Sequence, residues 1–503
     1  MRQLVTAKEI ARVDREAQEL GIPELVLMEN AGRHAFRIWL AHALERSSPL
    51  PEELGPVVAV AGAGNNGGDS LVMARLCYDN GIPVTALVLR KELTGAPRSQ
   101  LQILENLGVP IHYWDDGGGE ELLARGRWVF DGIAGTGISG PLRGSYLEAV
   151  EAIGRSGARV VAIDLPSGMG DEFEPTFPTV RADLTVTMGV EKRALYHPVG
   201  RIRAGRITVG DPGFPRGSLV GFAPSRLAEE GDLPSLLPPL PGDAHKGQRG
   251  FLALFAGGEG TSGAAVLAGR SALSAGCGLL RLHIDTPLRA EAAVGEPAMM
   301  VEGVDPADPV GQIAGRLEGY TALAVGPGWG VSDKRGELLT HLLSSRLPAV
   351  VDADGLNNLA RLGGGEAVIG ESVLTPHPGE AARLLHCTIE EVLKDPPAAA
   401  ARITATYRAV CLLKGAVTVI TAPGGEEWFV EGLEPALGTA GSGDVLTGVI
   451  GSLLAQGLSP TDAAVAGALI HQGAGRRLRE ARGFFPASAL AEAIGTLAAR
   501  RGG

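Results

Sequence analysis

The chain has 503 residues, which is enough for two to four domains. Hydrophobic residues make up 45% of it and charged residues 20%, the proportions of a folded globular protein rather than a disordered one. A formal net charge of −12 argues against a nucleic-acid partner.

The sequence also lacks the patterns of exported and membrane proteins. Thr6-Ala7-Lys8-Glu9 is a capping box that predicts a helix, not a signal peptide. No run of about 18 apolar residues occurs, so we expect no membrane partner. The widely spaced cysteines form no metal-ligand pattern and are interpreted as reduced thiols: Cys77, Cys277, Cys387 and Cys411. We therefore expect a cytoplasmic protein.

The first half of the chain alternates helix-like and strand-like segments. Apolar residues at helical spacing predict helices over about residues 7–20 and 25–43. Val57–Ala61 is a short continuous apolar run, as expected for a strand buried on both faces. Further strands are predicted at Val84–Leu89, Trp128–Asp131, Arg159–Asp164 and Leu184–Met188. This order predicts a parallel sheet covered by helices, with ligands beyond the carboxyl ends of its strands.

Polar, glycine-rich clusters follow three of these strands. They are residues 62–69, which precede a helix predicted from about Leu71, residues 131–140 and residues 164–168. The first cluster lacks the spacing of a dinucleotide fingerprint, and its Asn and Asp oxygens favour a cation or a polar ligand. Any single cluster could be a turn that uses Asp, Asn and Gly for its own geometry. Three of them at successive strand ends indicate a binding site.

With LMENAG at 27–32, the motifs GNNGGD at 64–69, DGIAGTGISG at 131–140 and DLPSG at 164–168 resemble the NAD(P)H-hydrate epimerase domain. The resemblance covers about residues 1–220 and implies a Rossmann-like, three-layer α/β/α domain. It implies that Asp164 is the acid/base group and that Asn66, Asp131 and Ser167 bind K⁺. It implies further that the substrate is bound by Asp164 together with Asn65, Asn66, Gly67, Gly68, Asp69, Gly135, Thr136, Gly137, Ile138, Ser139, Gly140 and Pro141.

The sequence departs from this family at two places. Ser70 stands where a glycine usually follows GGD, which is expected to narrow the loop. Residues 168–172, Gly-Met-Gly-Asp-Glu, replace the Asp-Thr-Gly ending that usually follows DLPSG.

A proline-rich stretch at residues 212–241 is interpreted as a linker or interdomain brace. The domain boundary is predicted within it, near residue 225. The resulting domains are residues 1–222 and residues 223–503.

The second half begins a new α/β pattern. A strand at Phe251–Phe255 leads through the loop 257–263 into a helix with small residues on one face. The strand Ala322–Val325 enters a second glycine-rich loop at 326–330. A buried strand from Ala349 ends in two acidic residues, Asp352 and Asp354.

The loop at 438–444, Gly-Thr-Ala-Gly-Ser-Gly-Asp, predicts an anion site. Its glycines let backbone amides turn inward, and a helix predicted from about Gly443 adds its unpaired amides and the positive end of its dipole. Together the amides of Gly441, Ser442 and Gly443 would form an anion hole for a phosphoryl group. Asp444 would be the general base beside it, or else an Asp favoured by a helix's first turn.

Two further residues have open interpretations on their own. His377, between two prolines, is a poor core residue and favours a ligand contact. Lys414 at a strand end is either a surface lysine or a phosphate contact. The absence of a GxxxxGK[ST] motif excludes a P-loop enzyme.

HKGQRG, VGPGWG, VVDADGLN, TPHPGE, LLKGAVT and TAGSGDVLTG resemble the ribokinase-like superfamily and, within it, the ADP-dependent NAD(P)H-hydrate dehydratase. The match covers about residues 230–500. It implies that Ala264, Gly328, His377 and Asp444 face the hydrated cofactor, with Mg²⁺ accompanying ADP. It implies that the nucleotide is bound by Lys414, Gly415, Ala416, Val417, Thr418 and Gly443.

Together the two halves resemble bifunctional enzymes that repair hydrated NADH and NADPH. The resemblance implies epimerisation of the R and S hydrates (NADHX and NADPHX), then ADP-dependent dehydration of the S hydrate with release of AMP and phosphate. A homo-oligomer is also expected. Two alternatives stay open: an ATP-dependent vitamin or sugar kinase with a regulatory first half, and a non-enzymatic first half of the kind found in RNA-decapping factors.

Overall fold

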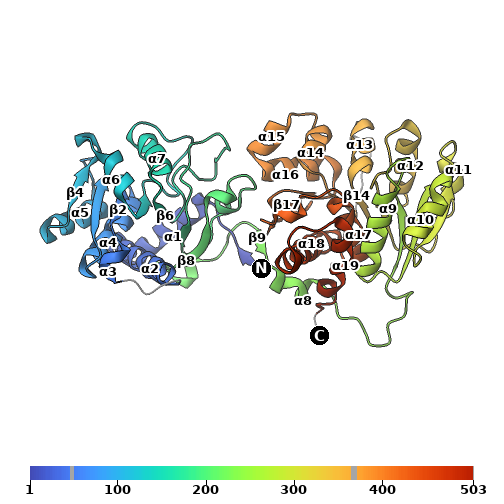
Figure 1. The fold of residues 1–503 in the computed structure, drawn as a ribbon, viewed down its shortest axis with the longest axis horizontal. Coiled ribbons are helices and arrows are strands. Elements are labelled where there is room, and N and C mark those ends of the chain that lie inside the picture. The colour runs from blue at the N-terminus through green and yellow to red at the C-terminus, as the bar shows by residue number, and fades with distance from the viewer. Residues whose placement is uncertain (46–49, 364–370, 502–503) are drawn as a thin grey trace. The chain divides into compact units, whose positions relative to one another are not determined.

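The computed structural model describes residues 1–45, 50–363 and 371–501. It divides into two compact units, one of residues 3–225 and one of Met1, Arg2 and residues 226–503. Each unit contains its own sheet (Figure 1). No helix of the described ranges combines the length and the apolarity needed to cross a membrane.

The first unit contains a seven-stranded sheet in the order β4-β3-β2-β5-β6-β7-β8. Every neighbouring pair is parallel, as predicted. Its strands are β2 Val57–Ala61, β3 Val84–Val88, β4 Ile111–Tyr113, β5 Trp128–Gly132, β6 Arg159–Ile163, β7 Leu184–Met188 and β8 Arg206–Gly210. Its α-helices are α1 Ala7–Glu19, α2 Glu24–Leu44, α3 Pro51–Leu54, α4 Asn65–Asp79, α5 Gly95–Leu107, α6 Gly119–Arg125 and α7 Ser145–Ser156.

The central strand β2 shows why helices cover both faces of this sheet. Its residues are all buried, and successive side chains point to opposite faces. Val57, Ala59 and Ala61 belong to one apolar cluster, which includes residues of α2, α4 and α5. Val58 and Val60 belong to another, with residues of α6 and α7. The predicted three-layer α/β/α domain is therefore confirmed.

The helix predicted from about Leu71 was placed too late, because α4 begins at Asn65. The amides of Gly67 and Gly68 donate to the Gly64 carbonyl at 3.0 and 3.3 Å, so GNNGGD forms the start of the helix rather than a loop before it. A Cβ on Gly67 would lie 2.1 Å from the Gly62 carbonyl oxygen. These glycines permit a close backbone approach, and their low helix propensity does not decide the local structure.

The second unit contains an eleven-stranded sheet in the order β1-β9-β18-β17-β16-β15-β14-β13-β10-β11-β12. The pairs from β12 to β16 are parallel, and β16-β17 and β17-β18 are antiparallel. The strands are β1 Arg2–Gln3, β9 Ser225–Ala228, β10 Phe251–Phe255, β11 Leu279–Asp285, β12 Met300–Val304, β13 Ala322–Val325, β14 Ala349–Val351, β15 Ser372–Leu374, β16 Val410–Leu413, β17 Val417–Thr421 and β18 Glu427–Glu431.

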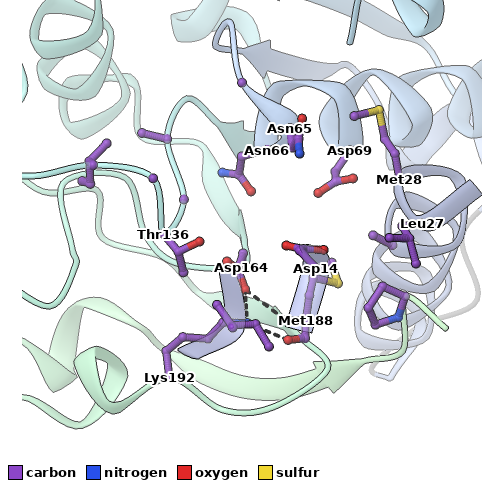
Figure 2. Close-up of a pocket in the computed structure, with 18 of the residues that line it drawn as sticks. Asp14, Leu27, Met28, Asn65, Asn66, Asp69, Thr136, Asp164, Met188 and Lys192 are labelled. Carbon is purple, nitrogen blue, oxygen red and sulfur yellow. Dashed lines mark hydrogen bonds and ion pairs between the residues drawn. The ribbon is translucent and has the colours of Figure 1, made fainter. Parts of the chain in front are cut away.

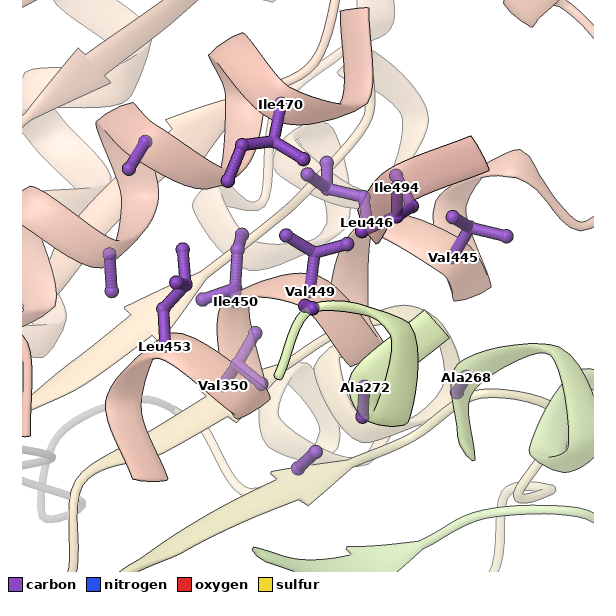
Figure 3. Close-up of a cluster of buried hydrophobic side chains, with 14 of the residues drawn as sticks. Ala268, Ala272, Val350, Val445, Leu446, Val449, Ile450, Leu453, Ile470 and Ile494 are labelled. Carbon is purple, nitrogen blue, oxygen red and sulfur yellow. The ribbon is translucent and has the colours of Figure 1, made fainter. Parts of the chain in front are cut away.

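Helix α17 lies at the centre of this unit's core (Figure 3). Val445, Val449 and Leu453 are fully buried. A Cβ on Gly448 would lie 2.0 Å from the Ala268 carbonyl oxygen, so α17 and α9 are in backbone contact there. The α-helices are α8 Leu233–Leu236, α9 Ser262–Ser274, α10 Arg289–Gly295, α11 Pro309–Ile313, α12 Asp333–Ser344, α13 Ala353–Arg361, α14 Pro378–Leu385, α15 Ile389–Lys394, α16 Pro396–Tyr407, α17 Ser442–Ala455, α18 Pro460–Arg482 and α19 Ala487–Ala498.

The proline-rich stretch at 212–241, interpreted from the sequence as a linker or interdomain brace, contains regular secondary structure. It contains β9, α8 and two short 3₁₀ helices, at Arg216–Ser218 and Glu230–Asp232. Ala228, Leu233 and Leu237 are buried in the second unit's apolar core. Burial of these apolar side chains outweighs the preference of the prolines for extended chain.

Candidate active sites

A cavity of about 380 Å³ opens beside the carboxyl ends of the first unit's strands. The strand order reverses between β2 and β5, and this is where open parallel sheets bind ligands. The loop after β5 and the start of α4, which follows β2, line the cavity (Figure 2). Among the predicted substrate contacts, the lining includes Asn65, Asn66, Asp69, Gly135, Thr136, Gly137, Ile138 and Asp164.

Five other predicted substrate contacts do not line this cavity. Gly67 and Gly68 lie in α4, where a Cβ on Gly68 would meet the Met28 sulfur at 2.4 Å. Ser139, Gly140 and Pro141 line a separate, open surface hollow instead. The glycines of GNNGGD therefore bring the helix close to its neighbours, and Asn65, Asn66 and Asp69 supply the polar groups of the cavity.

Asp164 has a strained backbone and a well-fixed side chain. Its φ of 65° lies in the left-handed region, which costs a non-glycine residue about 1–2 kcal/mol. Its Oδ1 accepts from the Met188 amide at 3.1 Å and lies 2.5 Å from the Lys192 ammonium. The Lys192 side chain is only 1% exposed. A Cβ on Gly135 would lie 3.5 Å from Asp164 Oδ2, so the second carboxylate oxygen lies close to the cavity wall formed by the 135–138 loop.

Asp131 and Ser167, two of the predicted K⁺ ligands, are buried together next to the cavity. Asp131 accepts from the Ser167 amide at 2.8 Å and from its hydroxyl at 2.5 Å. Burial raises the pKa of Asp131 to about 6, although the Ser167 and Ile133 hydrogen bonds oppose the rise. No basic side chain within the described ranges pairs with this carboxylate. Asp131, Ser167 and Asn66 all carry side-chain oxygen atoms, the donor type that hard cations take, so the group has the chemistry of a site for a monovalent cation.

Sequence reasoning missed three charged residues of the cavity, Asp14, Glu24 and Lys192. Burial and the neighbouring Asp164 carboxylate raise the pKa of Asp14 to about 6. Burial also raises the pKa of Asp69 well above its usual value, with Asp164 and Asp14 adding to the rise. No motif marks Asp14, because it lies in an ordinary amphipathic helix far from the glycine-rich loops.

The two departures from the family pattern lie outside the cavity lining. Ser70 is buried within α4, and a Cβ on Gly132 would meet its Cβ at 2.5 Å, so it does not narrow a loop as expected. In the altered segment after DLPSG, Asp171 accepts a hydrogen bond from the Ala7 amide at 2.8 Å. That segment therefore holds the first residue of α1.

The predicted anion site of the second unit lies at the start of α17. Gly441, with φ of 88°, is the N-cap, and the helix begins at Ser442. The Ser442 amide donates to Thr439 at 3.3 Å, whereas the described residues offer no acceptor to the amides of Gly443 and Asp444. The Gly441 amide has no acceptor among these residues either, so two of the three predicted anion-hole amides, those of Gly441 and Gly443, are free and the Asp444 amide adds a third.

Lys414 is a site residue rather than a surface lysine. Its ammonium lies 2.7 Å from Asp352 and 3.9 Å from Glu380. Asp352 also accepts from the Thr447 hydroxyl at 2.7 Å, and a Cβ on Gly443 would lie 3.6 Å from the Lys414 ammonium. Burial lowers the pKa of Lys414, but the carboxylates of Asp352, Glu380 and Asp444 outweigh it and raise that pKa.

Asp444 occupies the first turn of α17 beside this ion pair. Burial and the Asp352 carboxylate raise the pKa of Asp444 to about 6, Lys414 lowers it, and Asp354 raises it further. A carboxylate with this pKa is ionised at neutral pH and still basic enough to accept a proton. The local electrostatics therefore suit a general base.

The remaining predicted contacts of this site come from four loops. A Cβ on Gly328 would lie 3.0 Å from the Ala264 Cβ. The segments that follow β10 and β13 therefore meet at the point where the strand order reverses. His377 is the N-cap of α14 and its imidazole lies 3.4 Å from Glu380. The predicted nucleotide contacts Lys414, Gly415, Ala416, Val417 and Thr418 run from the end of β16 into β17.

Sequence reasoning also missed the residues that hold this site together. Asp352, Glu380 and Thr447 lie within motifs that mark this half of the chain but were given no role, and His471 lies outside every motif. The His471 imidazole lies 2.9 Å from the Ser442 carbonyl oxygen and 3.0 Å from its hydroxyl. Burial lowers the pKa of His471 to about 4, so this histidine is neutral where it contacts the anion-hole loop.

Comparisons with known proteins cover nearly the whole chain. Residues 24–194 match the family model of the YjeF-related protein N-terminus, and residues 252–496 match that of NAD(P)H-hydrate dehydratase. The bifunctional NAD(P)H-hydrate repair enzyme of Coxiella burnetii is 35% identical over 487 residues, 96% of each chain. That of Moorella thermoacetica is 36% identical over 505 residues, 95% of this chain and 93% of its own.

The second unit also resembles a solved structure. A crystal structure of a ribokinase-like superfamily protein from Enterococcus faecalis covers 56% of this chain and 97% of its own. The identity is 25% and the TM-score is 0.50. The predicted ribokinase-like fold is thereby confirmed.

Proposed function

Because the chain belongs to the family of bifunctional NAD(P)H-hydrate repair enzymes, we propose that its two units perform the two steps of that repair. Residues 1–222 act as the epimerase and residues 223–503 as the ADP-dependent dehydratase. The protein epimerises the R and S hydrates of NADH and NADPH and dehydrates the S hydrate to NAD(P)H, releasing AMP and phosphate. An ATP-dependent kinase or a decapping factor would not explain why bifunctional NAD(P)H-hydrate repair enzymes match both halves of this chain, in the same order.

The dehydratase mechanism rests on the position of Asp444. Two backbone amides there, those of Gly443 and of Asp444 itself, have no acceptor among the described residues, and the Lys414–Asp352 ion pair lies beside them. Asp444 takes the proton from the hydrate's hydroxyl as that oxygen attacks the β-phosphorus of ADP. The Gly443 and Asp444 amides and Lys414 stabilise the negative charge of the transferred phosphoryl group. AMP leaves, and phosphate is then expelled with the C–O electron pair while the adjacent carbon loses a proton, which restores the double bond. Mg²⁺ would neutralise the phosphate charge.

In the epimerase site we propose that Asp164 is the acid/base group for inversion at the carbon that bears the hydroxyl. The reduced nicotinamide ring contains an enamine, in which a C=C bond is attached to the ring nitrogen. Addition of water places a proton on the β carbon and the hydroxyl on the α carbon, so the hydroxyl lies on the ring carbon next to nitrogen. The Lys192 ammonium and the Met188 amide support the negative charge of Asp164. Asn66, Asp131 and Ser167 would hold K⁺, which would supply positive charge beside the substrate and order these oxygens.

The deciding experiment follows the absorbance of reduced nicotinamide as it is regained from a mixture of R and S hydrates. Complete recovery with ADP would support both activities in one chain. Recovery that stalls near the S fraction, apart from slow spontaneous epimerisation, would mean that only the dehydratase works. No recovery with ADP or ATP would contradict the proposed function. A homo-oligomer and a cytoplasmic location stay predictions of the sequence.

A further inference from the structure

The epimerase cavity contains more acidic groups than one proton exchange needs. The carboxylates of Asp14, Asp69 and Asp164 face the same open space in Figure 2. They come from α1, α4 and the end of β6, which are distant in sequence. Burial and the repulsion between like charges raise the pKa of Asp14 and of Asp69.

Asp14 and Asp164 differ in what stabilises them. Asp164 accepts from a backbone amide and forms an ion pair with Lys192. Asp14 receives no hydrogen bond and no ion pair from any residue that the structure describes. The charged groups around Asp14 are Asp164 and Lys192 on one side, Asp69 in α4, and Glu24 in α2. One of these two neighbouring carboxyl groups therefore has fixed cationic and amide partners and the other has none, a difference of the kind found in acid/base pairs.

Helix α1 is anchored at its start and along its buried face, and this fixes the position of Asp14. Thr6 and Glu9 form a capping box at its start, and Asp171 accepts from the Ala7 amide. Ile10, Val13 and Ala17 are buried. A partly buried carboxyl group without a structural partner, on a helix this well anchored, is explained by a function in the cavity.

Epimerisation by departure and return of the hydroxyl needs two proton transfers. The hydroxyl must gain a proton to leave as water, and the water that enters must lose one. We infer that Asp14 is a second catalytic carboxyl group of this site, which gives a proton to the departing hydroxyl while Asp164 accepts one from the entering water. This inference rests on the proposed epimerase function.

The step balances without any further reactant. The C–O bond breaks and its electron pair leaves with the new water, while the lone pair of the ring nitrogen forms a C=N bond. Water then adds to the same carbon through its own electron pair, and the C=N pair returns to nitrogen. The extra proton of the added water passes to Asp164 and from there to the neighbouring Asp14, which restores both groups.

The test uses the full-length protein without ADP, so that only epimerisation is observed. The purified R hydrate is the substrate, and the S hydrate formed is measured by chromatography after subtracting the enzyme-free rate. Asp14→Asn is expected to lower kcat about 100-fold or more with little change in KM, since an amide cannot transfer a proton. Glu19→Gln is the control, because Glu19 is an exposed carboxylate on the same helix.

Further readouts separate a catalytic role from a structural one. The dehydratase rate of Asp14→Asn, measured with S hydrate and ADP, should equal that of the wild type. Its melting temperature at pH 8 should be equal or higher, because the change removes one of several repelling charges. Asp14→Glu should regain part of the lost kcat. The wild-type rate should fall above about pH 6, where Asp14 loses its proton, and Asp14→Asn should lack that fall.

The outcomes have distinct meanings. If the wild type does not convert R to S hydrate, the proposed epimerase function itself fails. If the wild type is active and Asp14→Asn keeps more than half of its kcat, Asp14 is not a proton donor. Loss of kcat together with a lower melting temperature and no recovery in Asp14→Glu would assign Asp14 a structural role and overturn the inference.

Discussion

At the scale of single residues, both candidate sites use buried carboxylates whose pKa is raised by their surroundings. Burial is the largest cause at Asp14, Asp131 and Asp444, and each pKa is raised to about 6. Among the residues that the structure describes, Asp444 lies beside free backbone amides and a lysine, whereas Asp131 is paired with a serine and with no basic side chain. The same physical effect therefore suits a general base at one site and the ligand of a cation at the other.

The first residue-scale prediction concerns Asp444. Asp444→Asn should lower the dehydratase kcat by about 10²–10⁴-fold, because the hydroxyl loses its proton acceptor. The wild-type rate should rise with pH through about 6, as Asp444 becomes ionised, and then level off. The measurement is the ADP-dependent rate with S hydrate from pH 5 to 8.

Asp333→Asn is the matched control for this change, since Asp333 is also in the first turn of a helix of the second unit but its side chain is 88% exposed. It should leave the rate unchanged. Epimerisation should be normal in both variants. An Asp444→Asn rate within a factor of three of the wild type would refute the assignment of the base.

The second residue-scale prediction concerns stability in acid. Burial lowers the pKa of both His283 and His471 to about 4. In the unfolded chain a histidine binds its proton near pH 6.5, so between about pH 6.5 and 4 the unfolded state binds more protons than the folded state. Stability is therefore lost as the pH falls through this window. Between pH 7 and pH 5 each histidine should cost the second unit about 2 kcal/mol.

Denaturant unfolding of the second unit at the two pH values measures this loss. His283→Gln should reduce the difference between pH 7 and pH 5, because Gln does not titrate. His341→Gln, a change on the half-exposed face of α12, is the control and should leave the difference intact. Equal losses in all three proteins would contradict the role given to His283.

At the scale of elements, glycines decide where helices approach each other and the sheet. In GNNGGD they let α4 begin directly after β2, which brings Asn65, Asn66 and Asp69 to the cavity. In α17 Gly448 permits contact with the backbone of α9, the helix that begins beside Ala264. The spacing of α4 from β2 therefore affects the shape of the first site, and the spacing of α17 from α9 affects the shape of the second.

Gly448→Ala tests this packing. Its Cβ would lie 2.0 Å from the Ala268 carbonyl oxygen, so α17 and α9 must move apart. The second unit should lose at least about 2 kcal/mol of unfolding free energy, and dehydratase activity should fall as the anion-hole helix shifts. Thermal or denaturant unfolding measures the first effect, and the ADP-dependent rate measures the second.

Gly336→Ala is the control, because its Cβ would make an ordinary contact of 3.5 Å with Leu362 in the same unit. It should be neutral or slightly stabilising, since alanine is the better helix former. Similar stability of the two variants would show that α17 and α9 tolerate the added methyl group.

At the scale of the whole molecule, each unit has its own sheet, its own core and its own set of catalytic groups. Calorimetry of the full chain should therefore resolve two unfolding transitions. ADP at about 100 times its dissociation constant should stabilise only the second unit, by about 2.7 kcal/mol, and raise that transition by about 5 °C. Adenosine at the same concentration, which lacks the phosphates, is the control. A common shift of both transitions would mean that the units unfold together.

The sequence alone determined the family, the α/β class of both halves and the residues of the motifs. These are local properties: strands buried on both faces are continuous apolar runs, and the glycine, asparagine and aspartate of a ligand loop are contiguous. Asn66, Asp69, Asp164 and Asp444 were proposed from such motifs, and Lys414 was assigned a role only through the family resemblance. The start of α4 was predicted wrongly, and the elements within 212–241 were not predicted, because packing outweighs local preference at both places.

Only the tertiary structure decided which charges meet. Asp14 reaches Asp164 because α1 packs beside the carboxyl ends of the strands, and Lys192 reaches it from beyond β7. In the second unit Thr447 meets Asp352 across 95 residues, and His471 meets Ser442 across 29. No periodicity or motif records such contacts. They arise from strand order and helix packing, and with them arise the raised and lowered pKa values on which the chemistry depends.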